Sequence, residues 1–333
     1  MPKLEVEAKS FKLREAFTIS RGSRTEATVV EVRLIEGDHV GRGECVPYAR
    51  YNETVESVTA QIEGYRGRVE SGTLDRQGLQ GVMKAGAARN ALDLAFWDLE
   101  AKRAGCRVWE LKDYLVLGGK APGPVVSCYT LSIDTPEAMK RAAAANAARP
   151  ILKVKLGAGE DDMQRVAAVR EGAPDARIVI DANEGWQIFE YGERVLTLKE
   201  MGVEMIEQPV PQRFEDPFGA ITRPVPICAD ESCHTRATLN RLVGRYDMVN
   251  IKLDKTGGLT EALQLRTEAE RQGMGVMVGC MMSSSLAVAP AVLLSTGVQL
   301  ADLDPPMLLA EDRDPALAVE GSTVQPPMPE LWG

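Results

Sequence analysis

The sequence is poor in histidine and has no closely paired cysteines, and both absences limit the kinds of site that it can form. Its 333 residues include only two histidines, His39 and His234, so a zinc site or a mechanism that needs several imidazoles is disfavoured. The six cysteines are scattered and form no CxxC pair. In a chain of this size, that pattern indicates reduced, buried thiols and a cytoplasmic protein.

Excess positive charge and an unbroken hydrophobic run are also missing. The formal net charge is −9, which disfavours nucleic acid and anionic membrane surfaces as partners. Residues 273–301 carry no charge, but serines at 283–285 and Pro290 interrupt them. We therefore expect a buried strand and helix there rather than a membrane span. The N-terminal segment MPKLEVEAKSFKL is too charged for a signal peptide.

What the sequence does contain is a regular spacing of ionisable residues in its second half. Each of them ends an apolar run, at intervals of 22 to 26 residues; they are Lys155, Asp181, Glu207, Asp230 and Lys252. One such interval fits a strand, a crossover helix and two short loops. Because the carboxyl ends of barrel strands meet on one face, the spacing predicts an α/β fold of the TIM-barrel type with these residues at its active-site face.

Counting strands places the charged residues around this barrel. The run VVSCYTL is the first expected strand, so Lys155 falls on strand 2 and Lys252 on strand 6, diametrically opposed. The carboxylates fall on strands 3 to 5, between the two lysines. Strand 8 ends in Asp302 and Asp304.

The chain is longer than the roughly 250 residues of a bare barrel, and its N-terminal part has a different pattern. Strand-like runs followed by helices predict an α+β capping domain over residues 1–115, ahead of a barrel over residues 120–307. The proline-rich segment 308–333 is expected to return to the capping domain. Gly41 and Gly43 are expected where the backbone turns or another segment approaches closely.

Asp181, Glu207 and Asp230 form an all-oxygen set of potential ligands. Carboxylates suit a hard divalent cation, Mg²⁺ in preference to Zn²⁺, which favours nitrogen and sulfur. A single aspartate after a strand is more often a helix cap or a turn former. Three carboxylates on adjacent strands, flanked by lysines, favour the metal site.

Lys153 and Lys155 alternate along one strand, so their side chains point to the same face. Two inward lysines are costly in a barrel unless the chemistry uses them. Lys155 is therefore the expected proton carrier, and Lys153 is expected to lower its pKa together with the cation. Removal of a proton next to a carboxylate creates a dianion, which a bound cation stabilises. The site is thus expected to remove an α-proton and hold an enediolate.

The segments that carry these residues resemble a known family. KVK, DAN, EQP, ADES and NIKLDKTGG, with RNALDLAFWDL upstream, resemble the enolase superfamily, muconate-lactonizing subgroup, whose lysine bases and Mg²⁺ fit this reading. The segments ISRGSRTEA, GECVPYARYNE, GCMMSS and ADLDPP extend the resemblance to the dipeptide epimerases of the L-Ala-D/L-Glu type. It covers nearly the whole chain.

This resemblance implies a (β/α)7β-type modified TIM barrel whose capping domain is completed by the C-terminal tail. It implies an isomerase of murein peptide metabolism that epimerises a dipeptide by 1,1-proton transfer through an enediolate. The implied roles are ligation of one Mg²⁺ per subunit by Asp181, Glu207 and Asp230, acid/base catalysis by Lys155 and Lys252, and binding of the dipeptide's amino terminus by Asp302 and Asp304.

The residues themselves favour a substrate with an amino group. Asp302 and Asp304 form an anionic patch that would repel a simple dicarboxylate and attract an ammonium. Arg21 and Arg24 lie in a glycine-containing loop of the capping domain, where a guanidinium could bind a side-chain carboxylate of the substrate. The alternatives without a binding role are that the two aspartates lie in a solvated acidic loop and that the two arginines are simply exposed to solvent.

Other activities remain open on the sequence alone. Muconate cycloisomerase and succinylbenzoate synthase share the lysines and the metal but have no use for amine-binding aspartates. A metal-free lyase that forms a Schiff base on Lys155 or Lys252 is the alternative from another reaction class. The dipeptide and the oligomeric state, including a homo-oligomer, are left open.

Overall fold

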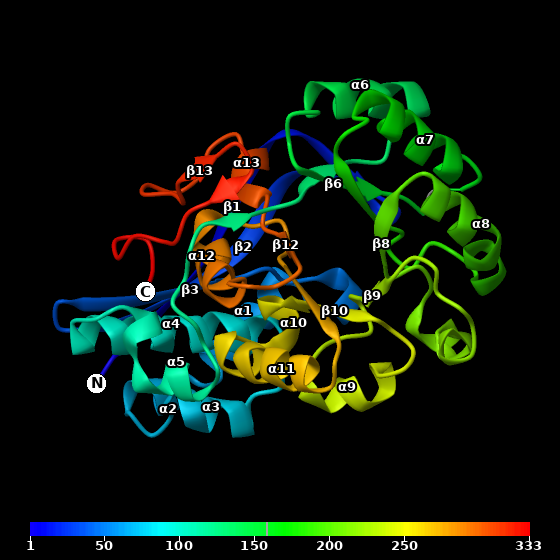
Figure 1. The fold of residues 1–333 in the computed structure, drawn as a ribbon. Helices are drawn as coiled ribbons and strands as arrows, with labels where there is room; N and C mark the ends of the chain where they lie inside the picture. Colours follow the sequence, from blue (N-terminus) through cyan, green and yellow to red (C-terminus); the bar gives the residue numbers. More distant parts are fainter. Residues whose placement is uncertain (158) are drawn as a thin grey trace.

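The second half of the chain forms a parallel barrel in the computed structural model, which describes residues 1–157 and 159–333. Eight strands follow one another around the barrel in chain order (Figure 1). The backbone N–H of Cys128, just before β5, donates to the carbonyl of Ala301 in β12 at 2.7 Å and links the two ends of the sheet. The strands are β5 (Tyr129–Leu131), β6 (Ile151–Lys155), β7 (Arg177–Asp181), β8 (Val203–Glu207), β9 (Ile227–Ala229), β10 (Met248–Lys252), β11 (Gly275–Gly279) and β12 (Leu300–Asp302).

Helices cover the outside of the barrel, as the crossover spacing predicts (Figure 1). The exception is the connection from β8 to β9, which holds two short 3₁₀ helices, η3 (Gln212–Phe214) and η4 (Asp216–Gly219). This connection is rich in proline, which lacks the N–H that an α-helix needs. The α-helices are α6 (Pro136–Ala145), α7 (Asp162–Gly172), α8 (Ile188–Glu200), α9 (Arg236–Leu242), α10 (Leu253–Thr256), α11 (Leu259–Arg271), α12 (Ser285–Leu294) and α13 (Pro305–Leu308).

The first expected strand is wrong at its beginning. Val125 and Val126 form β4, which lies outside the barrel and pairs with β14 (Thr323–Val324), itself paired with β13 (Val319–Glu320). Only the second half of VVSCYTL enters the barrel, as β5. β4 pairs with a strand of the C-terminal segment instead of a barrel strand. An apolar run in the sequence does not indicate pairing with a strand so distant in the chain.

The barrel interior changes from apolar to charged along its axis. One buried side chain from each strand or its flank fills the amino end, and these are Cys128, Ile151, Val179, Met205, Cys228, Met248, Met277 and Leu300. Side chains alternate along a strand, so the residues two positions later also point inward. Those residues include Lys153, Asp181, Glu207, Asp230 and Asp302, all of them buried. The same alternation therefore produces both the apolar plug and the charged site above it.

The N-terminal region is an antiparallel sheet covered by helices, with strand order β1-β2-β3. Its elements are β1 (Lys3–Ile19), β2 (Gly22–Glu36), β3 (His39–Cys45), η1 (Ala49–Tyr51), α1 (Val55–Glu63), α2 (Arg66–Glu70), α3 (Arg76–Val82), α4 (Ala87–Ala104), η2 (Val108–Glu110) and α5 (Lys112–Val116). A Cβ on Gly41 or Gly43 would lie 2.2 or 2.1 Å from a carbonyl oxygen of α4. The two glycines thus let β3 and α4 approach closely, as the sequence predicts.

The C-terminal segment lies against the N-terminal region. The Trp332 indole donates to the Arg42 carbonyl at 2.9 Å, and the Gly333 N–H donates to Asp98 at 2.8 Å. Arg313 reaches the buried carboxylate of Glu44. These contacts agree with a returning tail, while the domain limits 1–115, 120–307 and 308–333 stay a prediction.

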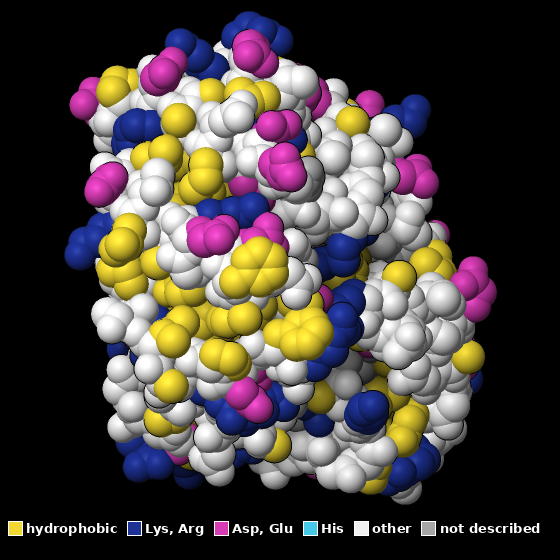
Figure 2. Space-filling model, turned by 90° about the vertical axis from the view of Figure 1, so that its right-hand side faces the viewer, with side chains coloured by type: hydrophobic (Ala, Val, Ile, Leu, Met, Phe, Trp, Pro, Cys, Tyr) yellow, Lys and Arg dark blue, Asp and Glu magenta, His cyan; other side chains and the backbone are white. Residues whose placement is uncertain are grey.

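The surface on the right of Figure 1 carries charged side chains of both signs around an area where hydrophobic side chains gather (Figure 2). Two hydrophobic residues of α8, Phe189 and Leu196, are exposed. In the described part of the chain, no helix combines the length and the hydrophobicity that a membrane crossing requires. The six cysteines are free; four are buried, whereas Cys106 and Cys280 are only partly buried.

Candidate active site

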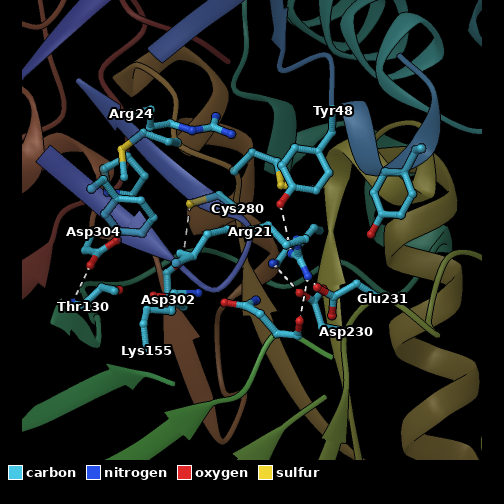
Figure 3. Close-up of a pocket in the computed structure, with 18 residues that line it drawn as sticks. Arg21, Arg24, Tyr48, Thr130, Lys155, Asp230, Glu231, Cys280, Asp302 and Asp304 are labelled. Atoms are coloured by element: carbon cyan, nitrogen blue, oxygen red, sulfur yellow. Dashed lines mark hydrogen bonds and ion pairs between the residues drawn. The ribbon is translucent and has the colours of Figure 1, made fainter. Parts of the chain in front are cut away.

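A pocket lies at the carboxyl ends of the barrel strands, beneath the N-terminal region. Lys155, Asp230 and Lys252 line its barrel side, and residues of β1, β2 and η1 line the opposite side. Figure 3 shows Arg24 above Asp304 on one side of the pocket, and Arg21 beside Asp230 and Glu231 on the other. The expected site residues are therefore brought together at one face.

The three predicted metal ligands are each anchored by one oxygen. All three carboxylates are almost completely buried. In each, one oxygen accepts a hydrogen bond from a neighbouring donor, and the other faces a lysine. The anchoring pairs are Asp181 Oδ1 with Asn183 N (2.8 Å), Glu207 Oε1 with Asn250 Nδ2 (2.7 Å), and Asp230 Oδ1 with Lys255 Nζ (2.5 Å).

Lys153 lies between the carboxylates. Its ammonium nitrogen is 2.5 Å from Glu207 Oε2, 2.7 Å from Asp302 Oδ2 and 3.3 Å from Asp181 Oδ2. Burial alone would lower the pKa of Lys153, but these carboxylates outweigh it and raise the pKa well above its usual value. Lys153 therefore stays positively charged, as a residue that tunes a neighbouring amine must.

Lys155 and Lys252 face the pocket from opposite strands, β6 and β10. Lys155 Nζ is 2.6 Å from Asp181 Oδ2, and Lys252 Nζ is 2.7 Å from Asp230 Oδ2. Burial would lower the pKa of Lys252, but Asp230 and Glu207 raise it well above its usual value. In this arrangement Lys252 is an ammonium that can donate a proton.

The carboxylate pKa values respond to the same contacts. Burial opposes ionisation of Asp181, yet Lys155 and Lys153 lower its pKa below the usual value. Burial and the neighbouring charge of Asp181 instead raise the pKa of Glu207. The positive charges of the lysines between these carboxylates thus compensate the cost of burying several negative charges together.

The donor set fits a hard divalent cation. Among the residues that the structure describes, no three carboxylate, thiol or imidazole groups already surround one point as metal ligands would. Lysine ammonium groups lie between the carboxylates instead. The three side chains nevertheless supply oxygen atoms only, from the ends of adjacent strands, and each is held by a separate hydrogen bond, as ligating carboxylates are.

The two arginines of the glycine-containing loop differ in their contacts. The Arg21 guanidinium donates to Glu231 Oε1 at 2.8 Å, to the Asn183 carbonyl at 2.9 Å and to the Tyr48 hydroxyl at 3.0 Å. It therefore fastens this loop to the barrel. The Arg24 guanidinium lines the pocket and makes no hydrogen bond or ion pair with any residue that the structure describes. Of the two, Arg24 is available to a ligand.

Asp302 and Asp304 both line the pocket. Asp302 Oδ2 contacts Lys153, and its Oδ1 is buried without a hydrogen-bond partner in the described structure. Asp304 Oδ2 accepts from the Thr130 N–H at 2.7 Å. Burial and the charge of Asp302 raise the pKa of Asp304 to about 7.

Three residues of the site were not singled out from the sequence. Lys255 and Gln208 contact Asp230, and Glu231 contacts Arg21. Gln208 and Glu231 each follow a predicted ligand directly, and Lys255 lies one helical turn after Lys252. The available signals were this adjacency and the position of the three residues in the segments EQP, ADES and NIKLDKTGG, but neither signal distinguishes a residue of the site from a neighbour of one.

Comparison with known proteins agrees with this geometry. Residues 3–112 match the family model of the mandelate racemase / muconate lactonizing enzyme N-terminal domain, and residues 137–328 match that of the enolase C-terminal domain-like family. The L-Ala-D/L-Glu epimerase of Escherichia coli is 46% identical over 95% of this chain and 97% of its own length. The N-acetyl-D-glutamate racemase of a Pseudoalteromonas species is 41% identical over 92% of this chain and 95% of its own.

A solved structure matches along the whole chain. An enolase family member from Agrobacterium tumefaciens, described as homologous to dipeptide epimerases and holding sodium and L-Ala-L-Glu, is 51% identical, covers 100% of both chains and has a TM-score of 0.95. A dipeptide epimerase from Enterococcus faecalis with Mg and L-Leu-L-Tyr is 29% identical, covers 98% and 96% of the two chains and has a TM-score of 0.87. The chain belongs to the mandelate racemase / muconate lactonizing enzyme family of the enolase superfamily.

Proposed function

We propose that this protein is an isomerase that epimerises dipeptides of the L-Ala-D/L-Glu type by 1,1-proton transfer through an enediolate. The observation that carries the proposal is the placement of Lys155 and Lys252 on opposite strands of the barrel, facing the same pocket. An α-carbon bound between them has one amine on each face. Relatives with this activity at up to 46% identity support the same reaction.

Each lysine serves one configuration of the substrate. A neutral amine on one side removes the α-proton, and the ammonium on the other side returns a proton to the opposite face. Asp230 and Glu207 favour the charged form of Lys252, which is the form that returns a proton. Lys153 supplies a fixed positive charge beside Lys155, and both lie near Asp181.

The carboxylates of Asp181, Glu207 and Asp230 are the proposed ligands of one Mg²⁺ per subunit. When bound, a divalent cation supplies the positive charge that stabilises the second negative charge of the enediolate. Neighbouring dipeptide epimerase structures that contain Mg support a divalent metal here.

The ends of the pocket fit the ends of a dipeptide. Asp302 and Asp304 are proposed to receive the substrate's ammonium. The Oδ1 of Asp302, which has no hydrogen-bond partner among the described residues, supports this. Arg24 is proposed to receive the side-chain carboxylate of the second residue. Arg21, which the sequence also suggested for that role, is already engaged by Glu231 and is proposed to hold the loop in place.

The test is α-proton exchange in deuterated water with a library of dipeptides that vary at both positions. We expect exchange at the second residue, highest with L-Ala-D-Glu and L-Ala-L-Glu, and its loss in excess chelator. Full exchange in chelator, together with trapping of an adduct by borohydride, would favour the Schiff-base lyase instead. Turnover of peptides from murein, a cytoplasmic location and a homo-oligomer stay predictions.

A further inference from the structure

We propose that Lys255 and Gln208 are positioning residues that hold Asp230 from two sides and thereby raise the affinity of the site for its divalent cation. The proposal rests on the metal site of the proposed function. It concerns the one predicted ligand that the barrel strands do not hold themselves. Asp181 and Glu207 end β7 and β8 and are paired in the sheet, whereas β9 ends at Ala229, before Asp230.

Lys255 has no free donor. It is buried at 1% exposure on the short helix α10. Its ammonium nitrogen donates to Asp230 Oδ1 at 2.5 Å, to the Asp230 carbonyl at 2.5 Å and to the Asn250 carbonyl at 2.9 Å. An ammonium has three N–H groups, and all three are used. Lys255 is therefore suited to hold Asp230 and not to exchange a proton with a substrate.

Gln208 holds the other side of the same turn. Its Oε1 accepts from the N–H of Asp230 at 2.9 Å and from the N–H of Ser232 at 3.1 Å. Its Nε2 donates to Ser232 Oγ and to the Tyr246 hydroxyl, each at 3.0 Å. Gln208 is fully buried and has a φ of 33°, a conformation that is costly for a residue other than glycine. These hydrogen bonds explain why the conformation persists.

Together the two residues leave one atom of Asp230 available. Its N–H is held by Gln208, and its carbonyl and Oδ1 are held by Lys255. Oδ2 faces the pocket, 2.7 Å from Lys252. The turn after β9 thus presents a single carboxylate oxygen in a defined direction, which is the arrangement that a cation with strict coordination geometry requires.

Charge and position predict opposite effects of removing Lys255. The positive charge of Lys255 repels a nearby cation, so on charge alone a neutral residue there would tighten Mg²⁺ binding. If its hydrogen bonds orient the ligand, the same change weakens binding, because loss of a residue that orients a metal ligand typically costs about 10- to 100-fold in affinity. The sign of the change in affinity therefore separates the two roles.

The experiment is calorimetric titration of the metal-free protein with MgCl₂, for the wild type, Lys255→Met and Gln208→Met. We expect both variants to bind Mg²⁺ about 10- to 100-fold more weakly than the wild type. The matched control is Lys102→Met, which removes a lysine that also donates to a carboxylate and a carbonyl, Asp98 and Val40, both at 2.8 Å. Lys102 lies on α4 of the N-terminal region, so this control should keep the wild-type affinity.

Unchanged or tighter Mg²⁺ binding by folded Lys255→Met would overturn the role of Lys255, and unchanged binding by Gln208→Met would overturn that of Gln208. Thermal unfolding identifies a variant that does not fold. If Lys255→Met does not fold, Lys255→Arg replaces it, because this variant keeps the charge and changes the hydrogen-bond geometry. We expect Lys255→Arg to bind Mg²⁺ more weakly than the wild type, and unchanged or tighter binding would overturn the role of Lys255. Failure of the wild type itself to bind Mg²⁺ would instead refute the metal site, and with it the proposed cofactor.

Discussion

Replacement of Asp304 by Asn removes one negative charge from the pocket while it preserves the local hydrogen bonding. Asp304 is buried, and its Oδ2 accepts from the Thr130 N–H at 2.7 Å. An amide oxygen can accept the same hydrogen bond, so β5 keeps its partner. Asp302 offers no comparable change, because its carboxylate contacts the fully buried ammonium of Lys153 at 2.7 Å. Loss of that partner would leave a buried charge less compensated.

The expected effect follows from the value of a charged hydrogen bond. If Asp304 binds the dipeptide ammonium, its contact contributes about 1.5–3 kcal/mol, which corresponds to a loss of about 10- to 150-fold in kcat/KM. N-acetylation of the substrate should cost the wild type a similar factor. The same acetylation should do little further harm to Asp304→Asn, because both changes remove one interaction and their effects do not add.

The pH dependence provides an independent check. Burial and the charge of Asp302 raise the pKa of Asp304 to about 7, and ammonium binding requires the ionised form. The preference for a free over an N-acetylated dipeptide should therefore increase as the pH rises through about 7, and it should fall again as the substrate's own α-ammonium loses its proton at about pH 8. The rise should be absent in Asp304→Asn. The ratio of the two substrates cancels the titration of the catalytic lysines, which both reactions share.

Stability should change with pH in a defined direction. The folded pKa of Asp304, about 7, lies above the roughly 3.9 of an unfolded aspartate. Its contribution to stability is therefore present below about pH 4 and is lost as the pH rises through about 7. The wild type should thus lose Tm relative to Asp304→Asn between about pH 4 and 7, with no further relative loss at higher pH, when metal-free proteins are compared by thermal unfolding.

Two outcomes would refute this reasoning. If the wild type has the same kcat/KM for free and N-acetylated substrates, the dipeptide assignment fails, and an N-acylamino acid becomes the better substrate class. This alternative is specific, because one relative of the chain is named N-acetyl-D-glutamate racemase, after an N-acylated amino acid. If Asp304→Asn loses equally with both substrates, Asp304 positions the strand and does not bind the ammonium.

The remaining predictions concern the arginines and the lysines. Arg24→Gln should reduce the preference for Glu over Leu at the second position by about 10- to 150-fold without lowering Tm, and equal substrate profiles for the wild type and this variant would contradict the role of Arg24. Arg21→Gln should instead lower Tm, because it removes the contacts of the loop to the barrel. Lys155→Ala and Lys252→Ala should each abolish epimerisation but retain exchange of the α-proton in deuterated water with one epimer of the substrate, and the retained epimer should differ between the two variants. Equal exchange of both epimers in either variant, measured by NMR, would contradict the two-base mechanism.

The sequence by itself determined the barrel and the inward direction of its charged residues. The spacing of ionisable residues predicted successive strands, and alternation within ILKVK predicted that Lys153 and Lys155 share a face. The structure confirms the shared face, because both ammonium groups contact the same oxygen of Asp181. These features depend on local geometry, because a strand alternates its side chains whatever it pairs with. The segments that carry the resemblance likewise required no tertiary contact to be recognised.

Only the tertiary structure decided which of these charges touch. It brings Lys153 against Asp302, a separation of 149 residues along the chain, and fastens Arg21 to Glu231 while it leaves Arg24 facing the pocket. It also moved Val125 and Val126 out of the barrel to pair with the C-terminal segment. Such contacts depend on how the sheet closes and on where segments far apart in the chain meet. A pattern that repeats along the chain contains no information about either.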